Sequence, residues 1–333
     1  MRTYADYLTG VFHPEGYHGH RRDRNFFEGW YVKLVSADQQ HRWAIIPGVF
    51  MGPQAGLADN QAFVQVLDGT NGKAWFHEFD FRCFKADAQR FFVDVADNHF
   101  DASGLALNLP GIRGTISFTS PLDPWPVTPA SPGIMGWYGA VPFMECLHGI
   151  VSFGHSLSGS LEIDGKLVSF EGGRGYIEKD WGKAFPAGYV WMQSNHFREH
   201  ADASFIGSVA IIPWMGSAFR GFILGLKHSD HLFKWTTYNR TSEQQLEITD
   251  AHVVWRLSGP DGLLQVTADR KSGGLLKAPM RTEMHKRVEE TMVSSIKVEH
   301  YDASGKLLFS DIGDSAALEV FGDIDRLLAT QRR

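Results

Sequence analysis

The sequence predicts an all-β protein of two antiparallel β-domains with few short helices. Short β-prone runs recur along all 333 residues and are separated by Gly, Asn and Asp turns. Several turns have hairpin sequences, for example Asp164-Gly165 and Asp261-Gly262. Aromatic residues make up 13% of the chain, and their side chains suit a pleated surface. This spacing is typical of closed barrels or sandwiches rather than of alternating strands and helices.

The expected strands form two groups along the chain. The first group comprises 26–35, 43–51, 61–67, 73–84, 91–95, 112–118, 158–163 and 167–170. The second comprises 189–197, 204–212, 219–226, 232–238, 247–257, 263–268, 294–301 and 306–311. Helices are expected only at 282–291 and 324–330.

A faint internal repeat divides the chain near its centre. Ala44-Ile45-Ile46-Pro47 recurs about half a chain later as Ala210-Ile211-Ile212-Pro213, and each copy follows an aromatic strand. A chain of this length commonly holds two domains. We therefore expect two similar β-domains, at residues 1–183 and 184–333.

Composition narrows the class of protein. The net charge is −6 and no long Lys/Arg run occurs, which disfavours nucleic acid as a partner. Two cysteines imply no disulfide framework. The first residues lack the apolar run of a signal peptide, and no stretch is long and apolar enough to span a bilayer. We expect a cytoplasmic protein, while peripheral contact with lipid and the oligomeric state stay open.

The segment Gly175 to Phe197 places many charged side chains among large aromatic ones. Strand alternation puts Tyr176, Glu178 and Asp180 on one face, and it puts Glu28 with Trp30 on a face of another strand. Trp191, Gln193 and Asn195 share a face in the same way. If these faces point into a common cavity, they give the aromatic walls and few polar groups of a small-molecule site. If they point outward, they are solvated edges.

Such a pocket would favour acid-initiated chemistry on an alkene. Burial holds a carboxyl group protonated, so that it can donate a proton near neutral pH. Trp and Tyr rings would stabilise a developing cation by cation–π attraction. This chemistry calls for no redox cofactor and no metal.

Other motifs give weaker indications. The spacing of His13, His18 and His20 matches no common zinc pattern, so a polar N-terminal arm is the favoured interpretation. Cys146 is expected to be a small buried residue, with Glu145 and His148 as outer candidates for the same cavity. The proline-rich segment 121–142 is interpreted as a flap over the cavity mouth, or else as a connector packed on the surface.

Several motifs resemble the tocopherol cyclase family. Gly16-Tyr17-His18 and the run Arg24 to Lys33 (RNFFEGWYVK) are similar to its N-terminal signature. EKDWG at 178–182, Phe185-Pro186 and WMQSN at 191–195 resemble its central signature. LKAP at 276–279 and AALEV at 316–320 are weaker matches to its C-terminal portion. The matches follow in order, so the resemblance covers nearly the whole chain.

The resemblance implies two lipocalin-like β-barrels with an apolar ligand site, a fold shared with carotenoid hydratase-like proteins. The plant enzymes close a prenylated hydroquinone to a chromanol: protonation of a double bond gives a tertiary cation, which the phenolic oxygen captures. The plant pattern has Asn where this chain has Asp180. Asp180 is therefore either an extra acid or a salt-bridge partner for Lys179.

The first functional hypothesis is a cofactor-independent cyclase acting on an apolar isoprenoid-like molecule. Glu178 is the expected general acid and Glu28 the second choice, with Asp180 and His196 as further catalytic candidates. The expected substrate-binding residues, which would wall the cation or orient the oxygen nucleophile, are Trp30, Tyr31, Lys179, Trp181, Trp191, Gln193 and Asn195.

Three alternatives remain open from the sequence. Glu178, Lys179 and Trp181 could form a brace at the domain junction instead of a site. A lipocalin-like carrier would bind an isoprenoid without transforming it. A hydratase would let water capture the same cation.

Overall fold

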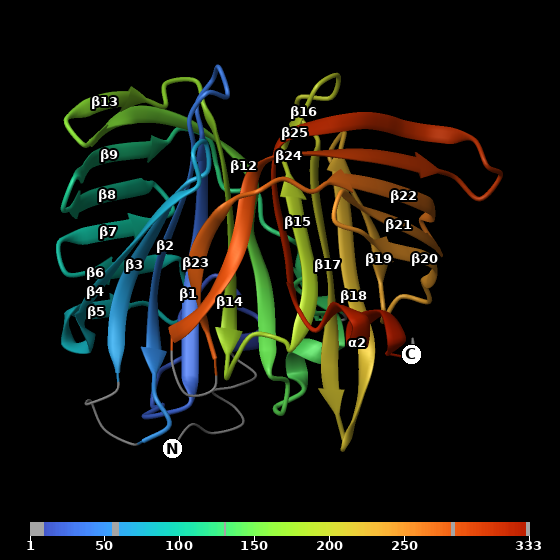
Figure 1. Cartoon of the computed structure of the whole chain (residues 1–333), viewed down its shortest axis with the longest axis horizontal. Coiled ribbons are helices and arrows are strands. Elements are labelled where there is room, and N and C mark those ends of the chain that lie inside the picture. Colours follow the sequence, from blue (N-terminus) through green and yellow to red (C-terminus); the bar gives the residue numbers. More distant parts are fainter. Residues whose placement is uncertain (1–9, 55–59, 130, 281–283, 331–333) are drawn as a thin grey trace. The chain divides into compact units, whose positions relative to one another are not determined.

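The computed structural model describes residues 10–54, 60–129, 131–280 and 284–330, and it confirms the all-β fold (Figure 1). The chain forms two compact units. Unit 1 comprises Met1–Phe185 and Leu276–Arg287, and unit 2 comprises Pro186–Leu275 and Val288–Arg333. The segment Leu276–Arg287 therefore belongs to unit 1, although the residues before and after it belong to unit 2. Unit 1 is thus made of two separate stretches of the chain.

Unit 1 is built on an antiparallel sheet with 12 strands in its described part, in the order β4-β3-β2-β1-β14-β12-β9-β8-β7-β6-β5, with β13 beside β12. Its strands are β1 (Phe26–Val35), β2 (Arg42–Met51), β3 (Gln61–Asp68), β4 (Lys73–Asp80), β5 (Phe84–Ala86), β6 (Phe92–Val95), β7 (Asn98–Asp101), β8 (Gly104–Leu109), β9 (Ile112–Phe118), β12 (Cys146–Ile163), β13 (Lys166–Ser169) and β14 (Arg174–Gly182). A small separate pair is β10 (Val127–Thr128) and β11 (Ser131–Pro132). Two short 3₁₀ helices are η1 (Phe81–Cys83) and η2 (Gly136–Ala140).

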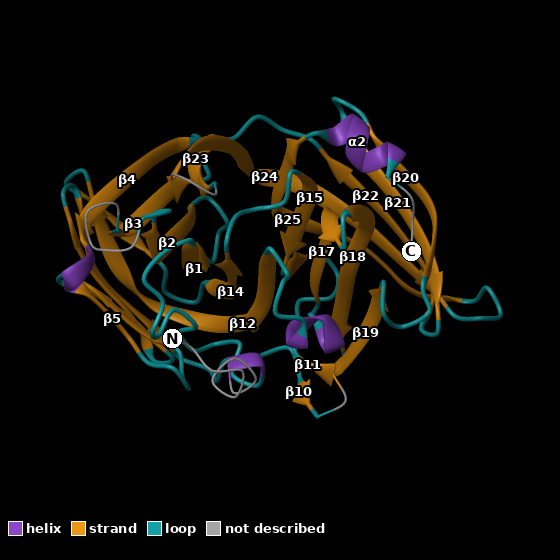
Figure 2. Cartoon of the chain, turned by 90° about the horizontal axis from the view of Figure 1, so that it is seen from below, coloured by secondary structure: helices purple, strands orange, loops and turns teal. Residues whose placement is uncertain are grey.

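The sheet of unit 1 is strongly curled, as its path from β4 through β1 and β12 to β5 shows in Figure 2. Trp30 on β1 and Phe84 on β5 are far apart in strand order, yet their ring centroids are 6.5 Å apart. Tyr17 of the N-terminal arm contacts both Phe84 of β5 and Phe26 of β1, with ring centroids 5.2 Å and 6.3 Å apart, respectively. The arm therefore fills the inside of the curl.

The curl gives β1 and β14 two distinct faces. These strands pair with Trp30 opposite Lys179 and Tyr31 opposite Glu178. Residues that pair directly across a sheet point to the same side. We call the face with Trp30 and Lys179 the inner face, and the face with Tyr31 and Glu178 the outer face.

Unit 2 is built on a second antiparallel sheet, with 11 strands in its described part, in the order β19-β18-β17-β15-β25-β24-β22-β21-β20; β16 pairs with β25 and β23 with β24. The strands of this sheet are β15 (Gly188–Ser194), β16 (His196–Phe197), β17 (Ser204–Trp214), β18 (Ser217–His228), β19 (His231–Thr236), β20 (Ser242–Ile248), β21 (His252–Gly259), β22 (Gly262–Asp269), β23 (Gly274–Pro279), β24 (Met284–Tyr301) and β25 (Leu307–Gly322). Most of β23 and the start of β24 belong to unit 1, and the helix α2 (Ile324–Ala329) belongs to unit 2. Its core is large and apolar and includes Trp235, Trp255 and Phe205. No described helix is long and apolar enough to cross a membrane.

Local expectations from the sequence have mixed outcomes. The Asp164-Gly165 hairpin is confirmed: both residues have positive φ, 49° and 79°, and Ile163 pairs with Lys166. The C-terminal helix is confirmed as α2. The helix expected at 282–291 is wrong from Met284 onward, where β24 begins. Pairing with β25, which includes Glu290 opposite Glu319, outweighs local helix propensity there.

The proline-rich segment 121–142 lies against β12. The Trp125 amide donates to the Ile150 carbonyl at 3.2 Å, and the Phe153 amide donates to the Asp123 carbonyl at 2.7 Å. Trp125 is buried and stacks on Phe153. These contacts favour the packed connector over the flap for this part of the segment.

The segment Leu276–Arg287 attaches to unit 1 through β3. The Lys277 amide donates to Gln65 Oε1 at 2.7 Å, and Gln65 Nε2 donates to the Lys277 carbonyl at 3.2 Å. Met284 packs with Phe27, Phe50 and Phe63. Main-chain and apolar contacts together hold this segment on the outer face.

We expect Gln65→Leu to loosen this attachment, because it leaves the partly buried Lys277 amide without its Gln65 acceptor, at a cost of about 1–3 kcal/mol. Hydrogen exchange of the Lys277 amide should become about tenfold faster or more. Gln245→Leu, on the exposed surface of β20, is the matched control and should leave that amide unchanged. Equal exchange in both variants would contradict the assignment.

Candidate active site

The inner face of unit 1 holds a buried ion pair between Glu28 and Lys179. The Lys179 ammonium donates to Glu28, to the Gly16 carbonyl and to His18 Nδ1. Its three N–H groups thus all have acceptors. The ammonium also lies 4.2 Å from the Trp30 ring centroid and 5.0 Å from that of Trp181. This arrangement braces β1, β14 and the N-terminal arm within unit 1, whereas the sequence left open a brace at the domain junction for Lys179 and Trp181.

The N-terminal arm is fastened to the same cluster. The His18 ring stacks on Trp181 with centroids 4.1 Å apart, and its Nε2 donates to the Gly10 carbonyl at 2.8 Å. The His18 amide donates to Glu28 at 2.8 Å. The expectation of a polar arm is therefore wrong for His18, which is buried. Sequence alone gave no signal that this arm folds back into the sheet.

Burial and charge set the protonation of the inner cluster. Burial lowers the pKa of Lys179, although the charge of Glu28 opposes this. Burial alone would raise the pKa of Glu28, but the charge of Lys179, with the hydrogen bonds that Glu28 accepts, outweighs it and lowers that pKa. Burial and then the Lys179 charge lower the pKa of His18. The ion-pair geometry and the lowered pKa of Glu28 support a charged Lys–Glu pair, and the lowered pKa of His18 supports a neutral imidazole beside it.

The outer face carries a second cluster, which we call the outer cluster: Tyr176, Glu178 and Asp180 of β14 with His148 of β12. The Tyr176 hydroxyl donates to Glu178 Oε2 at 2.5 Å. His148 Nδ1 donates to Asp180 Oδ1 at 2.8 Å, and its Nε2 lies 3.5 Å from Glu178 Oε2. The expected shared face of the three β14 residues is confirmed.

The imidazole of His148 is charged in this setting. Burial lowers its pKa, but the charges of Glu178 and Asp180, with their hydrogen bonds, raise it to about 10. Burial, and then the charge of Glu178, raises the pKa of Tyr176 well above its ordinary value. Burial and Asp180 act likewise on Cys146, whose Sγ is 3.9 Å from Asp180 Oδ1. His148 therefore bridges two carboxyl groups as an imidazolium.

An aromatic cluster shares the outer face. Phe27, Phe50 and Phe63 are buried with Met284, and Phe76 and Phe185 pack against them. Phe27 lies opposite Gly182 of β14, two positions from Asp180. Of the rings expected to wall a cation, Tyr31 is on this face, whereas Trp30 and Trp181 are on the inner face with Lys179 and Glu28. The rings near the outer cluster are mainly phenylalanines.

Four other predicted site residues belong to unit 2. Trp191 and Gln193 lie on β15, where Trp191 is opposite Glu319 and Gln193 opposite Ala317. Both are buried, and so is Asn195, while His196 on β16 is partly buried. Their expected roles beside a cation stay predictions.

Among the described residues, the outer cluster also has the spacing of a possible metal site. His148, Glu178 and Asp180 each offer one ligand atom, and these three atoms lie within 4.8 Å of one another. Histidine nitrogen and carboxylate oxygen are ordinary metal ligands. Here His148 already stands between the carboxylates as their counter-charge, so the ion pair accounts for the geometry.

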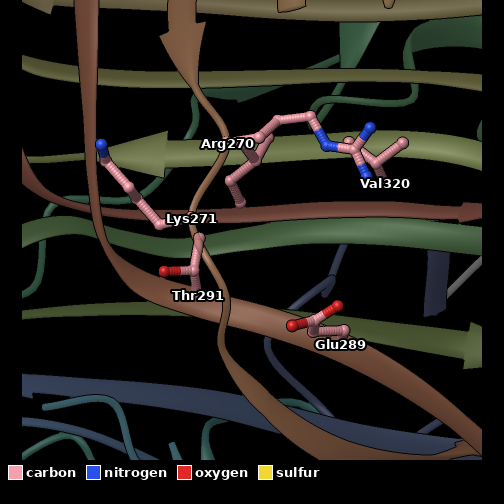
Figure 3. Close-up of a pocket in the computed structure, with 6 residues that line it drawn as sticks. Arg270, Lys271, Glu289, Thr291 and Val320 are labelled. Atoms are coloured by element: carbon pink, nitrogen blue, oxygen red, sulfur yellow. The ribbon is translucent and has the colours of Figure 1, made fainter. Parts of the chain in front are cut away.

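Unit 2 has a shallow pocket between β24 and the chain that precedes β23 (Figure 3). Arg270 extends over it and donates to the Thr249 carbonyl at 2.7 Å. Glu289 accepts from the Gly273 amide at 3.0 Å. Arg270 and Glu289 thus bind local backbone groups, and we assign this pocket no chemistry.

The curled antiparallel sheets define a lipocalin-like β-protein, and the outer cluster adds proton-bearing groups to one sheet face. The tocopherol cyclase-like family model matches residues 115–322. The chain therefore belongs to the tocopherol cyclase-like family, which confirms the resemblance seen in the sequence.

Two plant proteins are similar over part of the chain. "Probable tocopherol cyclase, chloroplastic" of Oryza sativa subsp. japonica is 28% identical over 222 residues, 61% of this chain and 46% of that protein. "Tocopherol cyclase, chloroplastic" of Zea mays is 26% identical over 201 residues, 56% and 41% respectively. The match thus spans less than half the length of these relatives.

Solved structures are similar along almost the whole chain. An AttH-type protein of Nitrosomonas europaea has a TM-score of 0.51 at 15% identity, covering 91% of this chain and 94% of its own. CghA with Sch210972 has a TM-score of 0.55 at 12% identity, covering 90% and 89%. Kievitone hydratase of Nectria haematococca has a TM-score of 0.50 at 10% identity, covering 90% and 90%. At these identities the likeness is one of fold.

The inner ion pair makes a stability prediction. Lys179→Met leaves a buried carboxylate without its partner, so we expect the free energy of unfolding to fall by about 3–5 kcal/mol. Urea denaturation followed by tryptophan fluorescence measures this. Lys73→Met is the control, because its 3.2 Å pair with Asp164 is exposed and such pairs contribute little. A loss no larger than in the control would refute the brace.

Proposed function

We propose that this protein is an acid-initiated cyclase of an apolar, isoprenoid-bearing hydroquinone or a related substrate. The observation that carries the proposal is the outer cluster: four titratable groups on the same sheet face as a group of phenylalanine rings. Family membership supports the choice of reaction. Because the curated relatives are matched over less than half their length, the substrate is part of the proposal.

Acid-initiated cyclisation requires a proton donor and aromatic rings, and the outer face carries both. A carboxyl group in a partly desolvated site can protonate a double bond. Aromatic faces stabilise the resulting tertiary cation, by up to about 2 kcal/mol or more for a desolvated ring. The phenolic oxygen then captures the cation and releases its proton. Substrate and product are isomers, so no electron acceptor or donor is consumed.

The test is incubation of the purified protein with prenylated hydroquinones in D₂O, read by mass spectrometry. We expect an isomeric product with one non-exchangeable deuterium. The double variant Glu178→Gln/Asp180→Asn should abolish it, whichever carboxyl donates. Glu171→Gln, an exposed carboxyl that accepts from Ser158 at 2.8 Å, is the control and should retain activity.

Other products would point elsewhere. Kievitone hydratase shares the fold, and a product heavier by one water would indicate hydration of the same cation. Substrate that binds wild type and double variant equally, without turnover, would indicate a carrier and contradict the cyclase.

A further inference from the structure

The four groups of the outer cluster differ in how far solvent reaches them. The Tyr176 side chain is fully buried. Side-chain exposure then rises from 4% at Glu178 to 14% at His148 and 29% at Asp180. The four groups thus form a hydrogen-bonded row that is buried at Tyr176 and reaches solvent at Asp180. Of the two carboxyl groups in this row, Asp180 is the one that a bound molecule reaches more readily from solvent.

The strand next to Asp180 leaves space beside this carboxyl. Asp180 lies directly opposite Gly29 of β1, so no side chain stands at the neighbouring position. A Cβ atom on Gly29 would lie 3.5 Å from Ile46 Cγ2, 3.7 Å from the Pro47 carbonyl oxygen and 3.9 Å from Phe63 Cζ, which is ordinary contact. An aliphatic and an aromatic side chain therefore border this position, beside one backbone carbonyl, and such apolar walls suit an alkene.

Glu178 occupies the closed end of the same row. Its Oε2 accepts from Tyr176 and faces His148 Nε2. Tyr31 of β1 lies directly opposite it, and Ile150 of β12 lies on its other side. Side chains thus flank Glu178 on both neighbouring strands, whereas Asp180 has the glycine on one of them.

From this arrangement we infer that Asp180 is the proton donor and that His148 is the positioning residue that holds it. This inference rests on the proposed cyclase function and names its donor. In the step, the Asp180 O–H bond breaks as a C–H bond forms on the substrate double bond. The carboxylate that is left keeps its hydrogen bond from His148 Nδ1–H. When the phenolic oxygen bonds to the cation, its proton returns to Asp180, so the balance closes.

The titratable groups around Asp180 are His148 and Cys146 from β12 and Tyr176, Glu178 and Lys179 from β14, while β1 presents Gly29. The pKa of His148, about 10, keeps its imidazole charged between pH 5 and pH 8, so the hydrogen bond that positions Asp180 is present throughout this range.

The experiment compares single variants in the D₂O assay. We expect Asp180→Asn to lower kcat by about 10²–10⁴-fold with little change in substrate binding. His148→Gln should lower kcat less and change the shape of the pH profile. The matched controls are His99→Gln and Asp101→Asn, because His99 also lies between two carboxylates, Asp94 at 2.6 Å and Asp101 at 3.1 Å. These controls should leave turnover unchanged.

A second readout needs no turnover: NMR titration of the imidazoles. The His148 titration should lie well above the ordinary histidine range and move down in Asp180→Asn. Turnover retained in Asp180→Asn but lost in Glu178→Gln would overturn the inference and make Glu178 the donor. Loss of turnover on chelation, restored by Zn²⁺ or Mn²⁺, would also overturn it. The His148 titration can depend on Asp180 even if the wild-type protein transforms no substrate. In that case the proposed function itself fails, and the donor role of Asp180 fails with it.

Discussion

The buried pair of Glu28 and Lys179 is the constraint on which the rest of unit 1 depends. It links adjacent strands β1 and β14 and fixes the N-terminal arm through Gly16 and His18. A buried charge without its partner is costly, so both strands must hold this register. A one-residue slip would exchange the faces of β14 and bring Glu178 and Asp180 under the arm. The inner pair therefore determines which residues the outer face presents.

Much of the fold could be predicted because the signals are local. Asp164-Gly165 marks its own hairpin, and alternation along β14 correctly joins Tyr176, Glu178 and Asp180. The repeat also has structural meaning. Its copies lie on β2 and β17, which pair with the aromatic strands β1 and β15. In each sheet, the strand that carries the repeat thus pairs with the aromatic strand that precedes it in the sequence.

The unpredicted parts depend on contacts between distant residues. His148 joins Asp180 across β12 and β14, and His18 reaches Glu28 only because the arm turns back into the curl. The sequence singled out His148 as a candidate for the cavity, but no local pattern predicts that it pairs with Asp180 or that His18 pairs with Glu28. The strand at Met284 has a helix-like sequence, and its pairing with β25 decides otherwise. The Trp30 and Trp181 rings looked suited to a substrate cation, but the cation they contact is Lys179.

The charges of the two clusters explain why one of them suits proton transfer. On the inner face a charged Lys179 and a charged Glu28 cancel, and His18 is neutral. Adding or removing a proton there would leave a net charge in a fully enclosed site, which is costly. On the outer face one imidazolium stands between two carboxyl groups, so the uptake of one proton makes the group neutral. Neighbouring residues of a single strand can therefore divide structure and chemistry between its two faces.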